Sequence, residues 1–321
     1  MLAGTHGTGK ATILTGTMKE IVMREFALKV NDDNKLIGHA WEVKDPIANV
    51  VIFQGMEEYG LRYDHFAKFL NQNCINAYAL DCYGQGSNVK SDFSNESFWP
   101  EDGFFKMVDA HYCMVEEAKK NGAKTYVFAH SMGSFMGQMF IQRHPGAVEK
   151  IILCGTGSKK PGMGLAVMLA KRAGTGKKRF QKAKFLSKIM FGNFNKKIKN
   201  PKTAYDWLTY NEENVAKYVS DPLCGFGPTN GFCYQFLKGL KAMYTLDGLN
   251  NIDKNQSVFL ISGDADPVTN YGKCTQKMFD LYKNLGLKEV QKKIYSQARH
   301  ELIFEACRDE VYKDILDYLL G

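Results

Sequence analysis

Short apolar segments alternate with longer amphipathic segments along most of the chain. Runs rich in β-branched and aromatic residues, such as residues 50–55 and 257–263, are typical of buried strands. Segments with apolar positions every three to four residues, such as residues 62–71, are typical of helices that bury one face. Because strands alternate with helices, the pattern predicts an α/β fold with a mostly parallel sheet covered on both faces.

Eight strands and several helices are expected from this pattern. We expect strands over residues 22–30, 38–43, 50–55, 77–83, 126–129, 150–155, 257–263 and 290–295. Helices are expected over residues 62–71, 104–121, 271–285 and 302–320, and directly after residue 131. The first two strands have no helix between them, so they should pair as an antiparallel hairpin at one edge of the sheet.

One long segment interrupts the alternation. Between residues 156 and 251 apolar and basic residues are mixed without a strand pattern, and we interpret this segment as a basic helical cap. Residues 18–155 and 252–321 would then form the α/β core. Residues 1–17 are rich in glycine and threonine, and we expect a flexible N-terminal extension there.

Positive charge is concentrated in the predicted cap. The net charge is +8, yet from Lys159 to Lys202 there are fourteen Lys and Arg residues and no acidic residue. The eight cysteines are scattered without a metal-binding spacing, which favours free thiols in a reducing compartment. No apolar run approaches the ~18 residues of a membrane span, and the N-terminus does not resemble a signal peptide. We therefore expect a cytoplasmic protein, with possible peripheral attachment to a membrane.

A serine lies where a predicted strand gives way to a helix. Residues 126–129 are apolar, Ser131 follows, and apolar residues at helical spacing come at once after it. Ala129 and Gly133 are small, as is required where strand and helix backbones pass closely. This arrangement is typical of a nucleophile elbow, which holds a serine hydroxyl above the sheet, although the first small residue is usually glycine. Ser131 is therefore the candidate nucleophile.

A serine nucleophile requires a base, and two histidines follow Ser131 in the chain. His144 precedes Pro145 at the end of the predicted helix and faces the wrong edge of the sheet. His300 follows the strand predicted over residues 290–295, and in folds of this type the base lies in that place. His300 is therefore the candidate base.

The acid that orients the base should lie on the loop after the preceding strand. That loop offers Asp264 and Asp266. Asp266 precedes Pro267, where the loop turns back towards the histidine, whereas Asp264 is more typical of a carboxylate that caps a turn. Asp266 is therefore the candidate acid, which would hold the imidazole tautomer and stabilise the imidazolium.

Two backbone N–H groups should stabilise a developing oxyanion. One belongs to Met132, the residue after the nucleophile. The other is expected in the loop after the strand predicted over residues 50–55, where Met56 holds the corresponding position.

Residues 4–10 match the spacing G-x-x-x-x-G-K of a phosphate-binding loop. Ala11 replaces the hydroxyl that would bind Mg²⁺, and no strand precedes the segment. We expect no phosphate site there, and neither a zinc-ligand spacing nor a dinucleotide motif occurs elsewhere. The sequence predicts an enzyme without a metal or cofactor.

Several segments together resemble the α/β-hydrolase fold, and closely the monoacylglycerol lipase and lysophospholipase-like serine hydrolases of the serine aminopeptidase S33 type. The segments are residues 50–56 with Tyr63, 81–87, 129–133, 263–268 and 298–301, and in the predicted cap residues 206–208 and 221–224. The resemblance runs from about residue 18 to the C-terminus. It implies a catalytic triad of Ser131, Asp266 and His300, with an oxyanion hole formed by Met56 and Met132. Gln54 replaces the histidine that is usual in this family, which bears on how the oxyanion loop is braced.

The resemblance implies a carboxylic-ester hydrolase for acyl esters, in particular monoacylglycerols or lysophospholipids. Ser131 would attack the acyl carbonyl, His300 would move its proton to the leaving alcohol, and water would cleave the acyl-enzyme. Apolar cap residues would hold the acyl chain. The basic segment would contact an anionic membrane surface or a phosphate head group, or it is simply a solvated face.

Two other classes of function stay open at this point. One is a different enzyme with the same triad, either an aminopeptidase or an acyltransferase. An aminopeptidase needs acidic cap residues for the substrate amine, and the first half of this cap has none. The other is a non-catalytic protein that binds lipid or a partner. Nucleic acid binding is not expected, because the basic segment lacks a recognisable binding module.

Overall fold

The computed structural model of the protein describes residues 22–32 and 34–321. The predicted extension over residues 1–17 lies outside the described residues, and so does the glycine-rich segment 4–10.

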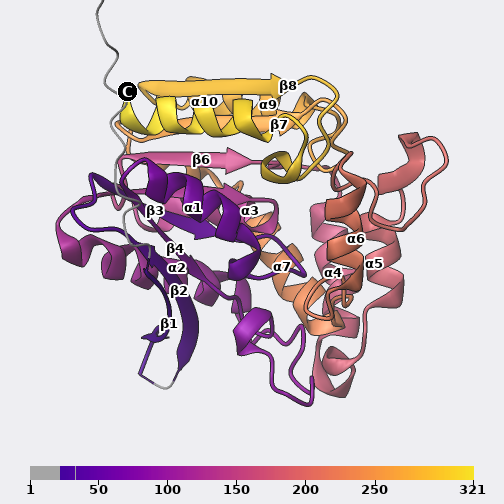
Figure 1. Cartoon of the computed structure of the whole chain (residues 1–321). Coiled ribbons are helices and arrows are strands. Elements are labelled where there is room, and N and C mark those ends of the chain that lie inside the picture. The colour runs from indigo at the N-terminus through magenta and orange to yellow at the C-terminus, as the bar shows by residue number, and fades with distance from the viewer. Residues whose placement is uncertain (1–21, 33) are drawn as a thin grey trace, which may run out of the picture.

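A mostly parallel sheet of eight strands runs through the centre of the molecule, as the sequence predicts (Figure 1). The strands are β1 (Val22–Lys29), β2 (Lys35–Glu42), β3 (Ala48–Phe53), β4 (Ile75–Leu80), β5 (Lys124–His130), β6 (Lys150–Cys154), β7 (Ser257–Gly263) and β8 (Glu289–Tyr295). Their order in the sheet is β1-β2-β4-β3-β5-β6-β7-β8. The predicted hairpin of β1 and β2 is confirmed at one edge, and β2 is also antiparallel to β4.

Helices cover both faces of the sheet. The helices that pack on the sheet are α1 (Asp64–Gln72), α2 (Gly103–Ala118), α3 (Met132–Arg143), α9 (Lys273–Asn284) and α10 (Arg308–Leu320). The apolar residues of α2, α3 and α9 share one core cluster, and those of α1 and α10 share the other. The fold is therefore the layered α/β arrangement that the alternating pattern predicts.

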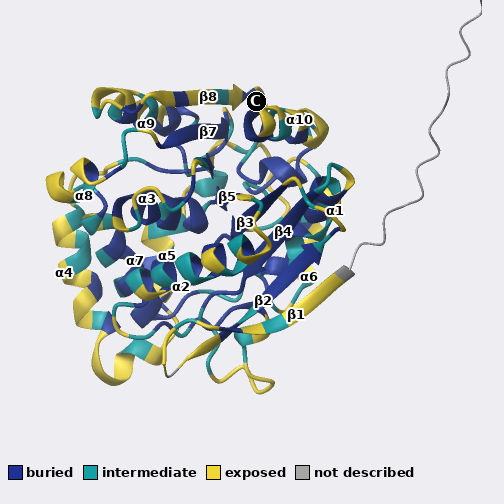
Figure 2. Cartoon of the chain, turned by 90° about the vertical axis from the view of Figure 1, so that its left-hand side faces the viewer, coloured by how far each residue is buried: buried dark blue, intermediate teal, exposed yellow. Residues whose placement is uncertain are grey.

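The strands supply both clusters because side chains alternate across a strand. In β3, Val51 and Phe53 belong to the cluster with α2 and α3, whereas Val50 and Ile52 belong to the cluster with α1 and α10. The central strands are buried, while β1 at the edge is largely exposed (Figure 2). Because both faces of these strands are buried, their sequences are nearly continuous apolar runs.

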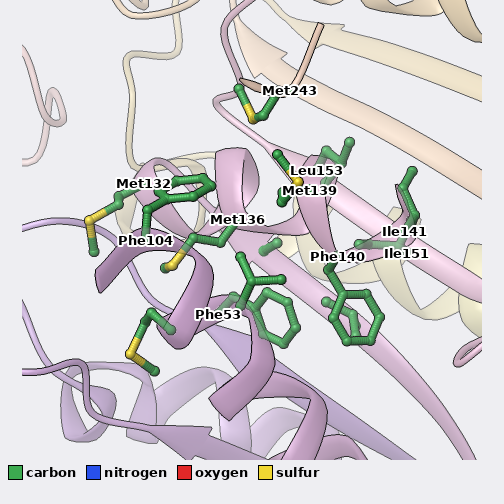
Figure 3. Packing of buried hydrophobic residues seen from close by; sticks show 14 of the residues in the cluster. Phe53, Phe104, Met132, Met136, Met139, Phe140, Ile141, Ile151, Leu153 and Met243 are labelled. Atoms are coloured by element: carbon green, nitrogen blue, oxygen red, sulfur yellow. The ribbon is translucent and has the colours of Figure 1, made fainter. Parts of the chain in front are cut away.

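Helix α3 packs tightly on the sheet beneath the serine turn (Figure 3). Phe53 of β3 lies edge-on to Phe140 of α3, with ring centroids 5.4 Å apart. Met132 and Met136 of α3 are buried in the same core cluster as Phe53. Methionine adapts to irregular gaps, so the start of α3 is held firmly against β3.

The segment between β6 and β7 lies beyond the carboxyl ends of the parallel strands (Figure 1). It contains α4 (Met163–Gly174), α5 (Lys184–Phe191), α6 (Glu212–Ser220), α7 (Asn230–Ala242) and α8 (Leu246–Asn250). Helix α7 returns to the core, where Gly239 lies against the ring of Phe104. We propose that residues 156–251 form a cap on a core made of residues 18–155 and 252–321. No helix within the described residues is long and apolar enough to cross a membrane.

One predicted helix is interrupted. Instead of a single helix over residues 302–320, a short 3₁₀ turn (Leu302–Phe304) precedes α10, and the backbone of Glu305 between them is extended. The buried carboxylate of Glu305 accepts hydrogen bonds from the N–H groups of Arg299 (2.8 Å) and Tyr210 (3.1 Å). These tertiary contacts hold Glu305 away from helical geometry, and periodicity alone does not reveal them.

Candidate active site

Ser131 occupies the sharp turn between β5 and α3. Its backbone φ is 52° and its ψ is −119°, a conformation that non-glycine residues rarely adopt. Its N–H donates to the carbonyl of Cys154 at the end of β6 (2.9 Å). A Cβ on Gly133 would lie 2.0 Å from the carbonyl oxygen of Phe53, so only glycine fits between α3 and β3. The local structure therefore has the geometry of a nucleophile elbow.

The structure brings Ser131, His300 and Asp266 into one hydrogen-bonded row. The Oγ of Ser131 lies 2.7 Å from Nε2 of His300, and Nδ1 of His300 lies 3.0 Å from Oδ2 of Asp266. Because a carboxylate can only accept, Nδ1 carries the proton and Nε2 is left to accept the serine hydroxyl. Ser131 can therefore pass its proton to His300 without any rearrangement.

Burial and charge shift the pKa of His300 in opposite directions. Burial lowers the pKa of the imidazole, but the charge of Asp266 and its hydrogen bond outweigh burial and raise the pKa above 6.5. The carboxylate itself is held by the N–H of Val268, which donates to Oδ1 (2.8 Å). One carboxylate oxygen of Asp266 therefore accepts a hydrogen bond from its own loop, and the other accepts a hydrogen bond from His300.

The residues set aside in the sequence have other partners in the structure. Asp264 accepts a hydrogen bond from the N–H of Gln297 (2.7 Å), as a turn-capping carboxylate does. His144 stacks on Tyr112, with ring centroids 4.2 Å apart, and its Nε2 lies 3.0 Å from Asp109. Neither side chain takes part in the row formed by Ser131, His300 and Asp266.

Met56 and Met132 both lie on the wall of the cavity that contains Ser131. Met132 is the first residue of α3, and the first N–H groups of a helix have no partner within that helix. The loop of Met56 is braced by Glu58, whose Oε1 accepts from the N–H of Gly55 (2.5 Å). The side chain of Gln54 donates to the carbonyl of Glu58 (2.9 Å), so it braces the loop in place of the usual histidine.

A buried ion network, which the sequence analysis missed, joins this loop to the histidine loop. Arg62 forms a bidentate pair with Glu301 (2.9 and 3.1 Å) and also binds Glu58. Tyr63 donates to Glu58 (2.8 Å), and its hydroxyl lies 3.1 Å from Nδ1 of His130. The four-residue spacing of Glu58 and Arg62 was a visible signal, although Glu58 lies in the loop before the 3₁₀ turn Gly60–Tyr63. The other partner, Glu301, is 239 residues away from Arg62.

The network holds Glu58 in its charged form. Burial raises the pKa of Glu58, but the charge of Arg62 and the hydrogen bond to His130 outweigh burial and lower it below the ordinary value. The pKa of Arg62 is correspondingly raised, against the effect of burial, mainly by the charge of Glu301. The loop of Met56 and the loop of His300 are therefore connected through a buried triad of side chains, Glu58, Arg62 and Glu301.

The proposed cap contacts the histidine loop directly. The N–H of Glu301 donates to the carbonyl of Leu208 (2.7 Å), and Arg299 donates to the carbonyls of Asp206 (2.5 Å) and Thr209 (3.1 Å). The ring of Trp207 lies 5.2 Å from that of His300. Residues 206–209 thus form one wall of the site, and their carbonyl groups bind the residues on either side of His300.

A cavity of about 610 Å³ opens onto Ser131 and His300. Its wall is mostly apolar. Side chains from residues 156–251 that line it are Met163, Ala166, Ile189, Met190, Phe191, Phe194, Trp207, Leu208, Phe236 and Leu237. Within residues 22–32 and 34–321, no cluster of three or more His, Cys, Asp or Glu residues is suited to a metal ion. The cavity suits an extended apolar ligand whose reactive group lies at Ser131.

A sequence model of one protein family, described as serine aminopeptidase S33, matches residues 44–306. The match covers most of the chain and includes all the residues discussed above. No curated protein matches the chain at a significant level.

Solved α/β-hydrolase structures share the fold. A thermostable carboxyl esterase from Bacillus coagulans, solved with glycerol, is 24% identical with a TM-score of 0.84, covering 94% of this chain and 99% of the esterase. A soluble variant of monoglyceride lipase from Saccharomyces cerevisiae is 17% identical with a TM-score of 0.70, covering 95% of both chains. A monoacylglycerol lipase from Paleococcus ferrophilus is 18% identical with a TM-score of 0.64, covering 94% and 98%.

The substitution Glu58→Ala should lower the free energy of unfolding by about 3 kcal/mol, because it leaves Arg62 buried with one partner fewer. The folded pKa of Glu58 lies below its unfolded value, so this contribution is present above pH 4.5 and is lost as the pH falls below it. Denaturant unfolding at neutral and acidic pH measures both effects.

Glu213→Ala is the matched control, because Glu213 forms an exposed pair with Lys217 (2.7 Å). Its loss should leave the free energy of unfolding nearly unchanged, because solvent screens an exposed ion pair. Equal effects of the two substitutions at neutral pH would contradict a stabilising role of the buried network.

Proposed function

Since this chain belongs to the serine aminopeptidase S33 family of α/β-hydrolases, we propose that it is a serine carboxylic-ester hydrolase. The observation that carries the proposal is the row of Ser131, His300 and Asp266 at the floor of an apolar cavity. The proposed substrates are monoacylglycerols or lysophospholipids. No cofactor is needed for this chemistry.

The proposed mechanism has two steps. Ser131 attacks the acyl carbonyl while His300 takes its proton, and the backbone N–H groups of Met56 and Met132 stabilise the oxyanion. His300 then returns the proton to the leaving alcohol, and the acyl group stays on Ser131. In the second step water attacks the acyl carbonyl while His300 takes its proton. His300 then gives that proton to the departing Oγ of Ser131, which frees the acid and restores the enzyme. Asp266 stabilises the imidazolium in both steps.

The size and lining of the cavity support a single-chain acyl ester. A volume of about 610 Å³ is in the range of drug-sized ligand sites, and apolar cap side chains surround most of it. The structural relatives with the same fold include two proteins described as monoacylglycerol or monoglyceride lipases and an esterase solved with glycerol. Both observations favour a substrate with one fatty chain and a small polar alcohol.

Aminopeptidase activity is the second candidate, because the matching family is described by that name. The same serine and histidine would then cleave an amide next to a terminal amine. Between Lys159 and Lys202 the proposed cap has no acidic residue to bind such an amine, so a carboxylate partner would have to come from elsewhere in the cavity. The mostly apolar cavity wall favours the ester hydrolase.

A fluorophosphonate probe should label the wild-type protein, and the Ser131→Ala variant should not be labelled. The wild type should hydrolyse a monoacylglycerol, whereas Ser131→Ala should lose at least about 10⁴-fold in kcat/KM. Ser134→Ala, at a nearby helical hydroxyl that donates to the carbonyl of Ser131 (2.6 Å), is the control and should still be labelled.

Equal labelling of wild type and Ser131→Ala would rule out the proposed nucleophile. Faster hydrolysis of aminoacyl anilides than of any acyl ester would instead favour the aminopeptidase.

Activity should fall in acid because His300 must be neutral to accept a proton. Asp266 raises the pKa of His300, so kcat/KM should be lost as the pH falls through a midpoint above 6.5. In Asp266→Asn that midpoint should move to lower pH, and kcat should fall by about 10⁴-fold. The pH profiles of both proteins on one neutral ester provide the measurement, and an unmoved midpoint would contradict the assigned pairing.

The exposed side of the proposed cap combines apolar and basic residues. Leu165, Met168 and Leu169 of α4 and Phe185 of α5 are more than half exposed. Fourteen Lys and Arg residues lie between Lys159 and Lys202. Helix α4 stands at the outer edge of the molecule, largely exposed (Figure 2). We propose that this surface makes peripheral contact with an anionic membrane.

Binding to anionic vesicles should weaken as salt increases, since each Lys or Arg near such a surface contributes about 1 kcal/mol. The double variant Lys184→Glu/Phe185→Ser should bind more weakly, with unchanged hydrolysis of a short soluble ester. The matched control Lys29→Glu/Met23→Ser changes an exposed basic and an exposed apolar residue on β1. Vesicle co-sedimentation provides the measurement, and salt-independent binding would mean that this basic surface is only a solvated face.

A further inference from the structure

One carboxyl group on the cavity wall has no part in the mechanism above. Glu57 follows Met56 in the oxyanion loop, lines the cavity and is only 8% exposed. Its two acidic neighbours in the cavity wall, Glu58 and Glu301, are both paired with Arg62. Within the described part of the chain, no cation lies within 4.0 Å of the Glu57 carboxylate.

The backbone of Glu57 is held on three sides. Its φ is 59°, in the left-handed region that favours glycine. Its N–H donates to the side chain of Gln85 (2.6 Å), and its carbonyl accepts from the N–H of Gly225 (3.1 Å) and the hydroxyl of Tyr218 (3.0 Å). A glycine would adopt this backbone at lower cost, so the glutamate side chain is present despite a local strain.

The groups that face Glu57 leave its charge largely uncompensated. Burial raises the pKa of Glu57 to about 7, although the backbone of Gly227 and the charge of Lys182 oppose this rise and Glu96 adds to it. Lys182 is itself bound by Glu96 and by the carbonyls of Phe226 (2.9 Å) and Gly227 (3.0 Å). It is therefore engaged elsewhere.

The remaining titratable neighbours are neutral at physiological pH. Burial raises the pKa of Tyr205 and of Cys233 to about 12, with Glu57 contributing to each shift, and it also raises the pKa of Tyr218. Glu57, Glu58 and Glu301 thus line the cavity with three carboxyl groups. Against them stand the guanidinium of Arg62, which pairs with two of the three, and the ammonium group of Lys160 elsewhere on the wall.

Aromatic rings stand beside this excess of negative charge. Tyr205 and Tyr218 line the same cavity, with their ring centroids 5.0 Å apart. The face of Tyr218 is already covered by the guanidinium of Arg62, which lies 4.9 Å from its ring centroid, so Tyr205 is the ring of this pair left to contact a ligand. A buried carboxylate and an aromatic ring on the same cavity wall are groups that recognise an ammonium group. An anionic group at this position would meet like charge and would lose its hydration.

We propose that Glu57 and Tyr205 form a subsite that binds a cationic ammonium group on the substrate. The inference rests on the proposed hydrolysis of acyl esters, and it makes Glu57 a specificity-determining residue for that reaction. The ammonium group sits either on the leaving alcohol, as in a choline or ethanolamine ester, or on the acyl part, as in an amino acid ester.

Two matched pairs of esters separate these sources. The first is hexanoylcholine and its carbon analogue, in which a quaternary carbon replaces the nitrogen. The second is the ethyl ester of aminocaproate and ethyl heptanoate, in which a methyl group replaces the ammonium. Within each pair, the ratio of kcat/KM for the charged ester to that for the neutral ester cancels the titration of His300, which both esters share.

The ratio for one pair should rise with pH through about 7 in the wild type, because Glu57 attracts the cation only when it is ionised. In Glu57→Gln the ratio should be lower by about tenfold at high pH and independent of pH. Glu213→Gln, which removes an exposed charge on α6, should leave the ratio unchanged. A rise in the first pair places the cation on the alcohol, and a rise in the second places it on the acyl part.

Binding measured without turnover keeps the two proposals separable. Calorimetry with the Ser131→Ala variant should show the same preference for the charged ester of one pair, and Ser131→Ala/Glu57→Gln should lose it. If no ester is hydrolysed yet this preference is observed, the hydrolase proposal fails and the subsite stands. A wild-type ratio that does not change with pH in either pair, or a preference that survives Glu57→Gln, would overturn the subsite.

Discussion

The arrangement of the site depends on one buried guanidinium. Arg62 binds Glu58, which braces the loop of Met56, and it binds Glu301, which follows His300 in the chain. A charge in such a place is stable only if both partners remain, since an unpaired ion would lose its hydration without compensation. The two loops on either side of Ser131 are therefore held at a defined separation by electrostatics rather than by the sheet alone.

The position of the serine turn depends on the sheet rather than on the ion network. Strands β3, β5 and β6 end at the same edge, and Phe53 pairs directly with Ala129 in the register of β3 and β5. The elbow is pressed against the end of β3, where Gly133 leaves no room for a side chain. Strain at Ser131 persists because the packing of α3 on the sheet compensates for it.

Local patterns were sufficient to predict most of the framework. The strand over residues 257–263 was predicted with its observed bounds, because it is buried throughout between two parallel neighbours and residues 258–261 are all apolar. The hairpin at the edge followed from the missing helix. The break at Glu305 could not be predicted, since it results from hydrogen bonds to Arg299 and Tyr210.

In the site, too, local patterns predicted some residues, whereas contacts between distant segments could not be predicted. Ser131, Asp266 and His300 stand in recognisable places after strands, so chain order was enough to nominate them, and the structure brings them within hydrogen-bonding distance. The pairing of Arg62 with Glu301 joins segments far apart in the chain, and no local pattern reveals it. Glu57 was overlooked because neither its positive φ nor the lack of a cation beside its carboxylate, among residues 22–32 and 34–321, can be recognised before the chain is folded.

The contacts between residues 206–209 and the histidine loop have a mechanical consequence. The carbonyls of Leu208 and Thr209 bind the backbone of Glu301 and the side chain of Arg299, on either side of His300. A substrate that widens the cavity by displacing this wall therefore also pulls on the imidazole. The room available to a ligand and the alignment of the proton acceptor are therefore coupled through these hydrogen bonds.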